Sequence, residues 1–179
     1  MSSDTHNILK HWREAVPNDR FAHLIRDTER AFRRALQLRL AVHQVPFGHW
    51  SYLRILWETD GLTQKELSER AGVMEPTTFA AMKAMEAKGY ITRKQLPTNK
   101  KNIYVYLTAK GRALKTRLVP HAEETNHISS RNVDAADLAI ARKVLLTMIA
   151  NLAEDEPRQL EMPANKPARS KMKAANKAD

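Results

Sequence analysis

The sequence predicts a mostly α-helical fold with one small antiparallel β-hairpin. Three observations support this fold class. Apolar residues recur at helical spacing over long stretches toward both ends of the 179-residue chain, and capping signals delimit two short helices between residues 62 and 89. The two segments that follow have the β-branched, aromatic and alternating composition of paired strands.

The N-terminal part is expected to contain two helices. Residues 1–17 form an extension with a short helix, in which Trp12 either closes a ligand pocket or packs against a partner subunit, the commoner case. A long amphipathic helix is predicted to start at Asn18, a good N-cap, and to run to about Val42. Its broad apolar stripe begins at Phe21 and needs a partner surface.

Two short helices with a tight turn between them are predicted next. Thr63 and Glu66 have the spacing of a capping box, which begins the first helix. Gly72 stands where a left-handed cap ends that helix. Pro76 suits the first turn of the second helix, which continues to Lys88.

The second helix has one apolar side and one side of small residues with a single lysine. The apolar side comprises Thr78, Ala81, Met82 and Met85, and the opposite side Pro76, Thr77, Ala80, Lys83 and Ala84. A face this small suits a helix lying in a DNA major groove about 12 Å wide. There Thr77 would bond a base edge or a phosphate, Ala80 would touch a thymine methyl, and Lys83 would bind a phosphate. The alternative is an ordinary amphipathic helix with a solvated face.

A hairpin follows, with strands over residues 90–96 and 103–107. Its predicted loop is basic, and Arg93 and Lys94 on the incoming strand add charge, so the tip would contact phosphates or the minor groove. The alternative is an ordinary solvated turn. Helix, turn, helix and hairpin in this order predict a winged helix-turn-helix whose DNA-contacting residues are Gln64, Pro76, Thr77, Ala80, Lys83, Arg93, Thr98, Asn99, Lys100, Lys101 and Asn102.

Two further helices are predicted at the C-terminal side. One starts after Thr108 and is expected to kink before Pro120, and the last starts at Asp134 and ends near Asp155. These outer helices are too long to pack only on a small module, so a homodimer is expected, with a compact monomer as the alternative. Residues 157–179 form a basic tail predicted to be disordered, which either adds nonspecific DNA attraction or only solubilises the chain.

Three stretches carry a family resemblance. LTQKELSERAGV, then MEAKGYITR, then LTAKG resemble the MarR family of bacterial transcription regulators over roughly residues 20–155. The resemblance implies a domain over 18–156, with a DNA-binding core at 47–108 and dimerisation segments at 18–45 and 109–156. It also implies that two recognition helices bind an inverted-repeat operator with half-sites about 34 Å apart.

The chain departs from the family pattern at two places. The family's wing usually carries an aspartate, any residue, then an arginine that reaches into the minor groove, whereas Asn99, Lys100 and Lys101 stand here. Lysine keeps the charge but lacks the planar fork of arginine. Ala80 stands where many members carry arginine, so base preference cannot be transferred from relatives.

Composition narrows the function classes. With 42% hydrophobic residues the chain can bury one core, and its net charge of +10 favours a polyanionic partner. The absence of cysteine excludes disulfides, thiolate zinc sites and the cysteine-based peroxide sensing of some family members. The sequence has no i,i+4 histidine pair beside a carboxylate, no glycine-rich phosphate loop and no serine in a nucleophile elbow. An enzyme is therefore not expected, and neither is a cofactor. Without a long apolar run or a secretory core, a cytoplasmic location is expected.

An aromatic segment before the helix-turn-helix suggests a ligand pocket. PFGHWSYLRILWETD contains aromatic residues with an arginine and a histidine, which suit a flat aromatic acid. Arg20 and Arg26 would bind the phosphates if the effector were a coenzyme A thioester. The predicted effector set is Arg20, Arg26, His43, Phe47, His49, Trp50 and Arg54. The alternative is that the tryptophans belong to the core and the histidine is a satisfied surface group.

The sequence therefore predicts a ligand-responsive DNA-binding regulator. Its expected role is to repress genes for aromatic acid catabolism until an aromatic acid or its coenzyme A thioester releases it from DNA. The alternative is a nonspecific nucleoid-type DNA-binding protein, or a protein-docking winged helix, without a small-molecule effector.

Overall fold

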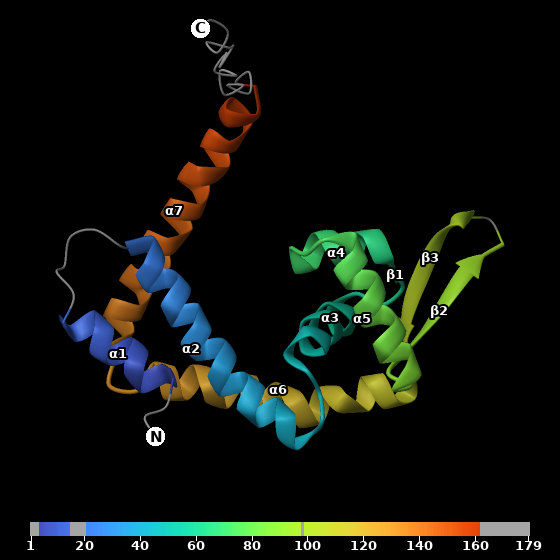
Figure 1. The fold of residues 1–179 in the computed structure, drawn as a ribbon, viewed down its shortest axis with the longest axis horizontal. Helices are drawn as coiled ribbons and strands as arrows, with labels where there is room; N and C mark the ends of the chain where they lie inside the picture. The colour runs from blue at the N-terminus through green and yellow to red at the C-terminus, as the bar shows by residue number, and fades with distance from the viewer. Residues whose placement is uncertain (1–3, 15–20, 98, 162–179) are drawn as a thin grey trace, which may run out of the picture. The chain divides into compact units, whose positions relative to one another are not determined.

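The computed structural model describes residues 4–14, 21–97 and 99–161, and the chain divides into two compact units, Met1–Arg131 and Asn132–Asp179. The second unit contains helix α7 (Ala135–Glu161). The first contains, in chain order, α1 (Asp4–Glu14), α2 (Phe21–Val42), α3 (Phe47–Glu58), β1 (Leu62–Thr63), α4 (Gln64–Ala71), α5 (Glu75–Ala87), β2 (Ile91–Leu96), β3 (Asn99–Leu107) and α6 (Ala109–Ser129) (Figure 1).

The predicted fold class is confirmed, with one strand more than expected. The antiparallel sheet has the order β1-β3-β2, and its short strand pairs Leu62 with Val105 and Thr63 with Tyr104. The sequence pattern placed Thr63 only at the start of a helix. Two residues are too few to show an alternation of apolar and polar positions, and this strand is defined only by its pairing with β3.

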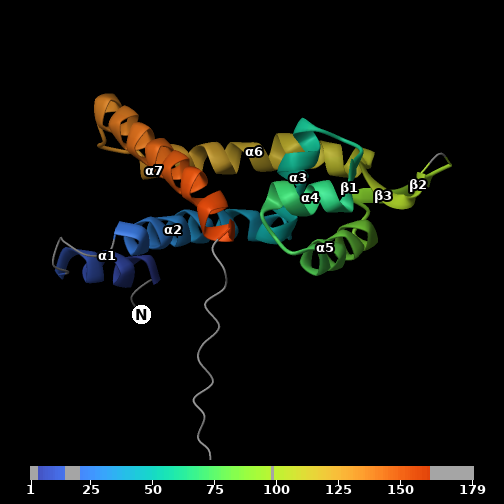
Figure 2. The same cartoon turned by 90° about the horizontal axis from the view of Figure 1, so that it is seen from above.

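The hairpin has a shorter loop than predicted. Residues 99–102 belong to β3 rather than to the loop, and Leu96 pairs with Asn99 after a register shift between Gln95 and Leu96. The prediction was wrong because polar residues there were taken as turn formers, whereas β3 already begins at Asn99, which pairs with Leu96. Figure 2 shows the hairpin projecting beyond the helices of the first unit.

Helix α3 lies at the centre of the hydrophobic core. Leu53 and Leu56 are almost completely buried, and they share a cluster with residues of α4, α5, the sheet and α6. The fully buried members of this cluster include Leu40, Leu67, Met82, Met85, Val105 and Leu118. One core thus fixes the helix-turn-helix and the base of the hairpin against α3 and α6.

Helices α2 and α6 lie side by side in both views (Figures 1 and 2) and are joined by polar contacts. Arg39 Nε donates to Glu124 at 2.9 Å, and the Nε2 atoms of His43 and His121 are 2.8 Å apart. Helix α6 continues as one helix through Pro120, the residue before which a kink was predicted.

Helix α7 begins after Asp134, as predicted, but ends at Glu161 rather than near Asp155 and passes through Pro157. None of its described side chains is buried, and its exposed apolar residues include Leu138, Leu145, Ile149 and Leu152. The predicted N-cap Asn18 and the tail from residue 162 onward lie outside the described residues.

Candidate DNA-binding surface and adjacent pockets

The first helix of the helix-turn-helix is held by the predicted caps. Thr63 Oγ1 accepts from the Glu66 backbone N–H at 3.2 Å, and Glu66 Oε2 accepts from the Thr63 backbone N–H at 2.7 Å, which completes the capping box. Gly72 adopts the left-handed conformation, with φ 64° and ψ 35°. Ser68 Oγ donates to the Val73 carbonyl, so the turn into α5 is fixed by a side chain as well.

The orientation of α5 follows from its buried side. Thr78, Met82 and Met85 are fully buried, as predicted for the apolar face. The Thr78 hydroxyl lies 2.9 Å from the Tyr52 hydroxyl of α3 in a buried hydrogen bond, which sets the rotation of α5 about its axis. The predicted outer residues Pro76, Thr77, Ala80 and Lys83 are all exposed.

Sequence reasoning missed Phe79, which lies at the edge of this outer face. Its side chain is 44% exposed, Lys83 Nζ lies 4.6 Å from the centre of its ring, and Arg93 Cζ lies 5.9 Å from it. Phe79, Pro76, Gln64 and Glu75 together line an open pocket of about 460 Å³ between α4 and α5. The spacing of four residues between Phe79 and Lys83 was the signal available in the sequence.

Arg93 joins the hairpin to α5. Its Nε and Nη2 donate to Glu86 Oε2 at 2.8 and 2.6 Å, and its backbone N–H donates to Oε1 at 3.1 Å. These hydrogen bonds lower the pKa of Glu86 below its ordinary value. The charge of Arg93 is therefore offset by a carboxylate, and the residue fixes the hairpin rather than presenting a free cation at its tip.

The tip of the hairpin is organised by Asn99. Its Oδ1 accepts from the Lys101 backbone N–H at 3.2 Å, and its Nδ2 lies 3.4 Å from the Tyr104 hydroxyl oxygen. An asparagine thus holds the backbone at the position where the family usually carries an aspartate. The side chains of Lys94, Lys101 and Asn102 are exposed, whereas Thr98 and the side chain of Lys100 lie outside what the structure describes.

The pockets of the described residues bring together only two of the predicted effector residues, Phe47 and Trp50. Phe47 and Trp50 line a pocket of about 200 Å³ together with α2 and α6 residues that include Phe32 and Ala122. Among the described residues, His43, His49 and Arg54 do not line this pocket. Trp50 is only 6% exposed and belongs to the core as well, and Arg54 is exposed.

His49 is a buried group of its own. Its side chain packs edge-on to Tyr90, with ring centres 6.5 Å apart, and its Nδ1 has no hydrogen-bond partner among the described residues. Burial lowers the pKa of His49, and the charge of Lys88 lowers it further. Both effects favour the neutral form of the ring, which makes His49 a poor cation for an anionic ligand.

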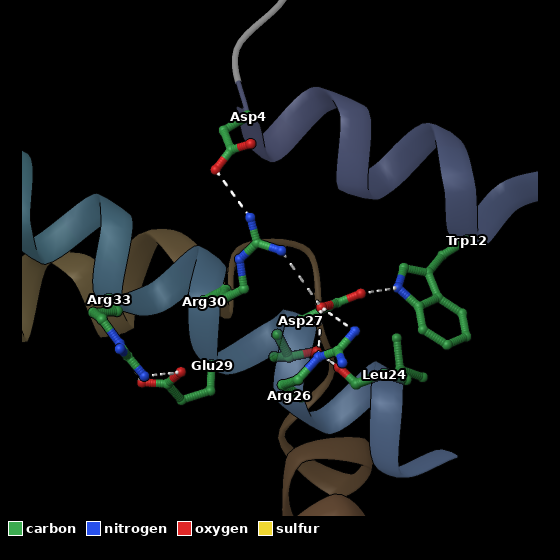
Figure 3. Close-up of polar contacts among 9 residues, drawn as sticks. Asp4, Trp12, Leu24, Arg26, Asp27, Glu29, Arg30 and Arg33 are labelled. Carbon is green, nitrogen blue, oxygen red and sulfur yellow. Dashed lines mark hydrogen bonds and ion pairs between the residues drawn. The ribbon is translucent and has the colours of Figure 1, made fainter. Parts of the chain in front are cut away.

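Arg26 forms an ion pair with its neighbour Asp27 (Figure 3). Its Nε donates to Asp27 Oδ1 at 3.2 Å, and the Trp12 indole N–H donates to Asp27 Oδ2 at 3.2 Å. The hydrogen bond from Arg26 lowers the pKa of Asp27 most, against the opposing effect of burial, and the one from Trp12 lowers it further. The bond from Trp12 to Asp27, together with the one from Arg30 to Asp4 at 3.3 Å, joins α1 to α2. Arg20 lies outside the described residues.

A larger cavity of about 380 Å³ lies beside Trp12, between α1, α2 and α6. It adjoins the smaller pocket, because Phe32 and Thr125 line both. Its apolar lining residues are Ile8, Leu9, Trp12, Leu24, Ala31, Phe32, Ala35 and Ile128. Trp12 therefore both bonds α2 of its own chain and lines a cavity, whereas the sequence alone left a pocket and a partner-subunit contact as alternatives.

The described residues do not suggest a metal centre or a membrane span. No cluster of three or more histidine and carboxylate side chains is placed to hold a metal ion within residues 4–14, 21–97 and 99–161. Over the same ranges, no helix has both the length and the apolar character needed to cross a membrane.

The helix-turn-helix with its three-stranded sheet defines this chain as a winged-helix protein. Residues 48–103 match the model of the MarR family. The crystal structure of a protein described as a MarR family transcriptional regulator from Listeria monocytogenes, complexed with 26mer DNA, has the same fold. Its TM-score is 0.69 over 76% of this chain and 91% of that chain, at 24% identity.

Curated relatives agree with this family. HTH-type transcriptional regulator TtmR of Methylorubrum extorquens strain PA1 is 33% identical over 93 residues, which are 51% of this chain and 48% of TtmR. The homoprotocatechuate degradative operon repressor of Escherichia coli is 28% identical over 82 residues, 46% of this chain and 55% of the repressor. The chain thus spans about half the length of these relatives. The match of residues 48–103 to the MarR family model and the names of these relatives agree with the resemblance found in the sequence.

Proposed function

We propose that this chain is a sequence-specific DNA-binding transcription regulator, in which α5 enters the major groove and the β2–β3 hairpin contacts the adjacent backbone. The observation that carries the proposal is the fixed rotation of α5. Because Thr78 is buried and bonded to Tyr52, the side with Thr77, Ala80 and Lys83 is held outward. A rigid helix with small outward side chains can approach base edges closely.

Charge supports a nucleic-acid partner. The chain has a net charge of +10, and exposed lysines occur on α5 and on the hairpin, at Lys83, Lys94 and Lys101. Each lysine that neutralises a phosphate releases a counterion, which makes affinity salt-dependent. The relatives named as transcriptional regulators and the DNA complex of the Listeria protein support the same interpretation.

The regulator is proposed to act as a homodimer. Helix α7 has 27 residues and leaves a stripe of large apolar side chains exposed, with Ile149 at 63% and Leu152 at 69%. An exposed apolar stripe of this length is typical of a surface that another protein surface covers. A second copy provides that surface symmetrically, and two recognition helices would then match half-sites of an inverted repeat about 34 Å apart.

A small aromatic acid, or its coenzyme A thioester, is proposed as the effector that releases the protein from DNA. The pocket lined by Phe32, Phe47 and Trp50 and the cavity beside Trp12 are apolar enough for an aromatic ring. The Escherichia coli relative is named as a repressor of a homoprotocatechuate degradative operon, and homoprotocatechuate is an aromatic acid. Arg33 and Arg39 line these pockets, but both are paired, with Glu29 and Glu124. An acid would have to compete with these carboxylates.

The test of DNA recognition is selection of duplexes from a random pool by the full chain, followed by affinity measurements at several salt concentrations. A regulator enriches one inverted repeat and binds it at least about a thousandfold more tightly than random duplex. Equal, salt-dependent affinity for all duplexes would instead identify the nonspecific nucleoid-type alternative. Lys83→Ala should weaken binding to all duplexes, and Lys143→Ala, which removes an exposed lysine of α7, is the control for the loss of one charge.

The effector proposal is tested separately by calorimetric titration with aromatic acids and with their coenzyme A thioesters. Binding that is weakened by Phe32→Ala and unchanged by Arg54→Ala would support the pockets, because Phe32 lines both and Arg54 lines neither. Absence of heat with every compound would remove the aromatic effector but leave DNA recognition intact.

A further inference from the structure

The feature that the proposed function leaves unexplained is the exposed ring of Phe79. Nearly half of this side chain is in contact with water, at 44% exposure, although it stands beside a DNA-facing helix surface made of small and polar groups. The core does not require it, because the buried face of α5 is complete with Thr78, Met82 and Met85. A large apolar side chain kept at the edge of a binding surface indicates a partner with an apolar group to offer.

Two cationic side chains lie close to the ring. Lys83 Nζ lies 4.6 Å from the ring centre, and Arg93, which lies 5.9 Å away, is itself fixed by two hydrogen bonds to Glu86. Cations at these distances stabilise the ring's position through its negative faces. Phe79 is therefore oriented before DNA arrives, and little side-chain freedom is lost on binding.

The pocket next to the ring suits a base edge better than a phosphate. Phe79 and Pro76 supply its apolar lining, and Gln64 and Glu75 its polar lining. The carboxylate of Glu75 would repel a phosphate group brought into the pocket. Among the groups that base pairs present in the major groove, only the C5 methyl of thymine is apolar.

We infer that Phe79 reads a thymine methyl group in each half-site of the operator, a role that rests on the proposed DNA-binding function. The sequence had offered Ala80 for such a contact. Phe79 suits it better, because its ring borders a pocket and covers far more apolar surface than a single methyl group. Ala80 remains free to let the helix approach the groove closely.

Replacement of thymine by uracil in DNA tests the inference, since it removes only the methyl group. The preferred duplex is first selected with the wild-type chain, and each thymine is then replaced in turn by deoxyuridine. At one thymine position per half-site, the replacement should weaken wild-type binding about fourfold, the value expected for loss of one buried methyl group. For Phe79→Ala the same replacement should not change the affinity. For Phe79→Leu it should weaken binding, but less than for the wild type.

The outcomes separate the two proposals. If a preferred duplex is selected but uracil substitution weakens wild type and Phe79→Ala equally, or weakens neither, Phe79 does not read a methyl group and the regulator proposal stands. If uracil replacement still weakens binding of Phe79→Ala but no longer weakens binding of Ala80→Gly, the methyl group contacts Ala80 instead. If no duplex is preferred, sequence-specific recognition fails, and the role of Phe79 fails with it. Unchanged circular dichroism spectra and melting of each variant confirm that the fold is retained.

Discussion

The contact between Gly111 and the carbonyl of Tyr90 makes Gly111→Ala a severe test of the packing. A Cβ atom at Gly111 would lie 2.0 Å from Tyr90 O and 3.1 Å from Leu107 Cδ2. The carbonyl is backbone, so it cannot rotate away as a flexible side chain would. It also accepts hydrogen bonds from the Thr108 backbone N–H at 3.0 Å and from Thr108 Oγ1 at 3.1 Å.

The magnitude follows from these contacts. Overpacking of a rigid site costs about 1–3 kcal/mol, and the two hydrogen bonds to Tyr90 O contribute about 1 kcal/mol each, so about 3–5 kcal/mol of stability should be lost. For a chain of this size that corresponds to a decrease in Tm of about 6–20 °C. Thermal unfolding followed by circular dichroism, at one fixed protein concentration, measures the change.

Gly48→Ala is the matched control. A Cβ atom at Gly48 meets nothing within 4 Å, and this glycine lies in helix α3. Alanine is the better helix former, so this variant should melt at or slightly above the wild-type temperature, with a gain of at most about 1 kcal/mol. If Gly111→Ala melted within about 2 °C of Gly48→Ala, the close approach of α6 to the start of β2 would be refuted, because a loss of even 1 kcal/mol moves Tm by about 2–4 °C.

Four further predictions concern the caps, the ion pairs and the hairpin. Thr63→Ala should lower the free energy of unfolding by about 1 kcal/mol, measured by urea titration, whereas Thr63→Ser should keep the capping bond. Because hydrogen bonds from Arg93 lower the pKa of Glu86, that pair contributes stability above the ordinary pKa of 4.5 and loses it as the pH falls through the lower, folded-state pKa. Glu86→Gln should therefore be less stable than wild type at neutral pH and approach it below pH 4.5, and an equal difference at both would contradict the pairing. Lys101→Ala should weaken binding to all duplexes alike and reduce the salt slope by about 0.9 for each phosphate that is no longer neutralised, and an unchanged slope would remove Lys101 from the interface. Trp12→Phe keeps an aromatic ring but removes the hydrogen bond to Asp27, so amide exchange in α1 should become faster while that in α3 stays the same.

Local features, which form between residues close together in the sequence, were predictable. The capping box of Thr63 and Glu66, the left-handed Gly72 and the buried face of α5 depend on bonds and periodicity inside one turn or one helix. Their signals are therefore complete in a short window of sequence. The order of these elements then determined the winged-helix fold class.

Features that depend on how elements meet were not predictable. Arg93 was expected at the DNA because it is basic and lies on the hairpin, but β2 brings it against Glu86 of α5. The exposure of Phe79 depends on the rotation of α5, which the buried bond between Tyr52 and Thr78 sets across two helices. Periodicity within one helix could not reveal either contact.

The lining of the pocket was not predictable for the same reason. Sequence reasoning grouped aromatic and basic residues that are near one another along the chain, whereas the pocket is closed by residues from distant helices, Phe32 of α2 and Ala122 of α6. Helical spacing alone does not decide burial, because Trp50 and Arg54 are four residues apart on α3 and yet Trp50 is buried and Arg54 is exposed. Pocket membership is a property of three helices packed together and has no signature in a single segment.

The same long-range contacts provide a route by which a ligand beside α2 and α6 could alter DNA binding. At its N-terminal end, α6 is fixed to α3, because Trp57 Nε1 donates to the Gly111 carbonyl at 3.0 Å, and to the hairpin, because Thr108 bonds Tyr90 O. The hairpin is fixed in turn to α5 through Arg93 and Glu86. Under the proposed function, we therefore expect a displacement of α6 to move the hairpin and α5 together. In the proposed dimer, such a movement would change the separation of the two α5 helices, and with it their fit to successive major grooves.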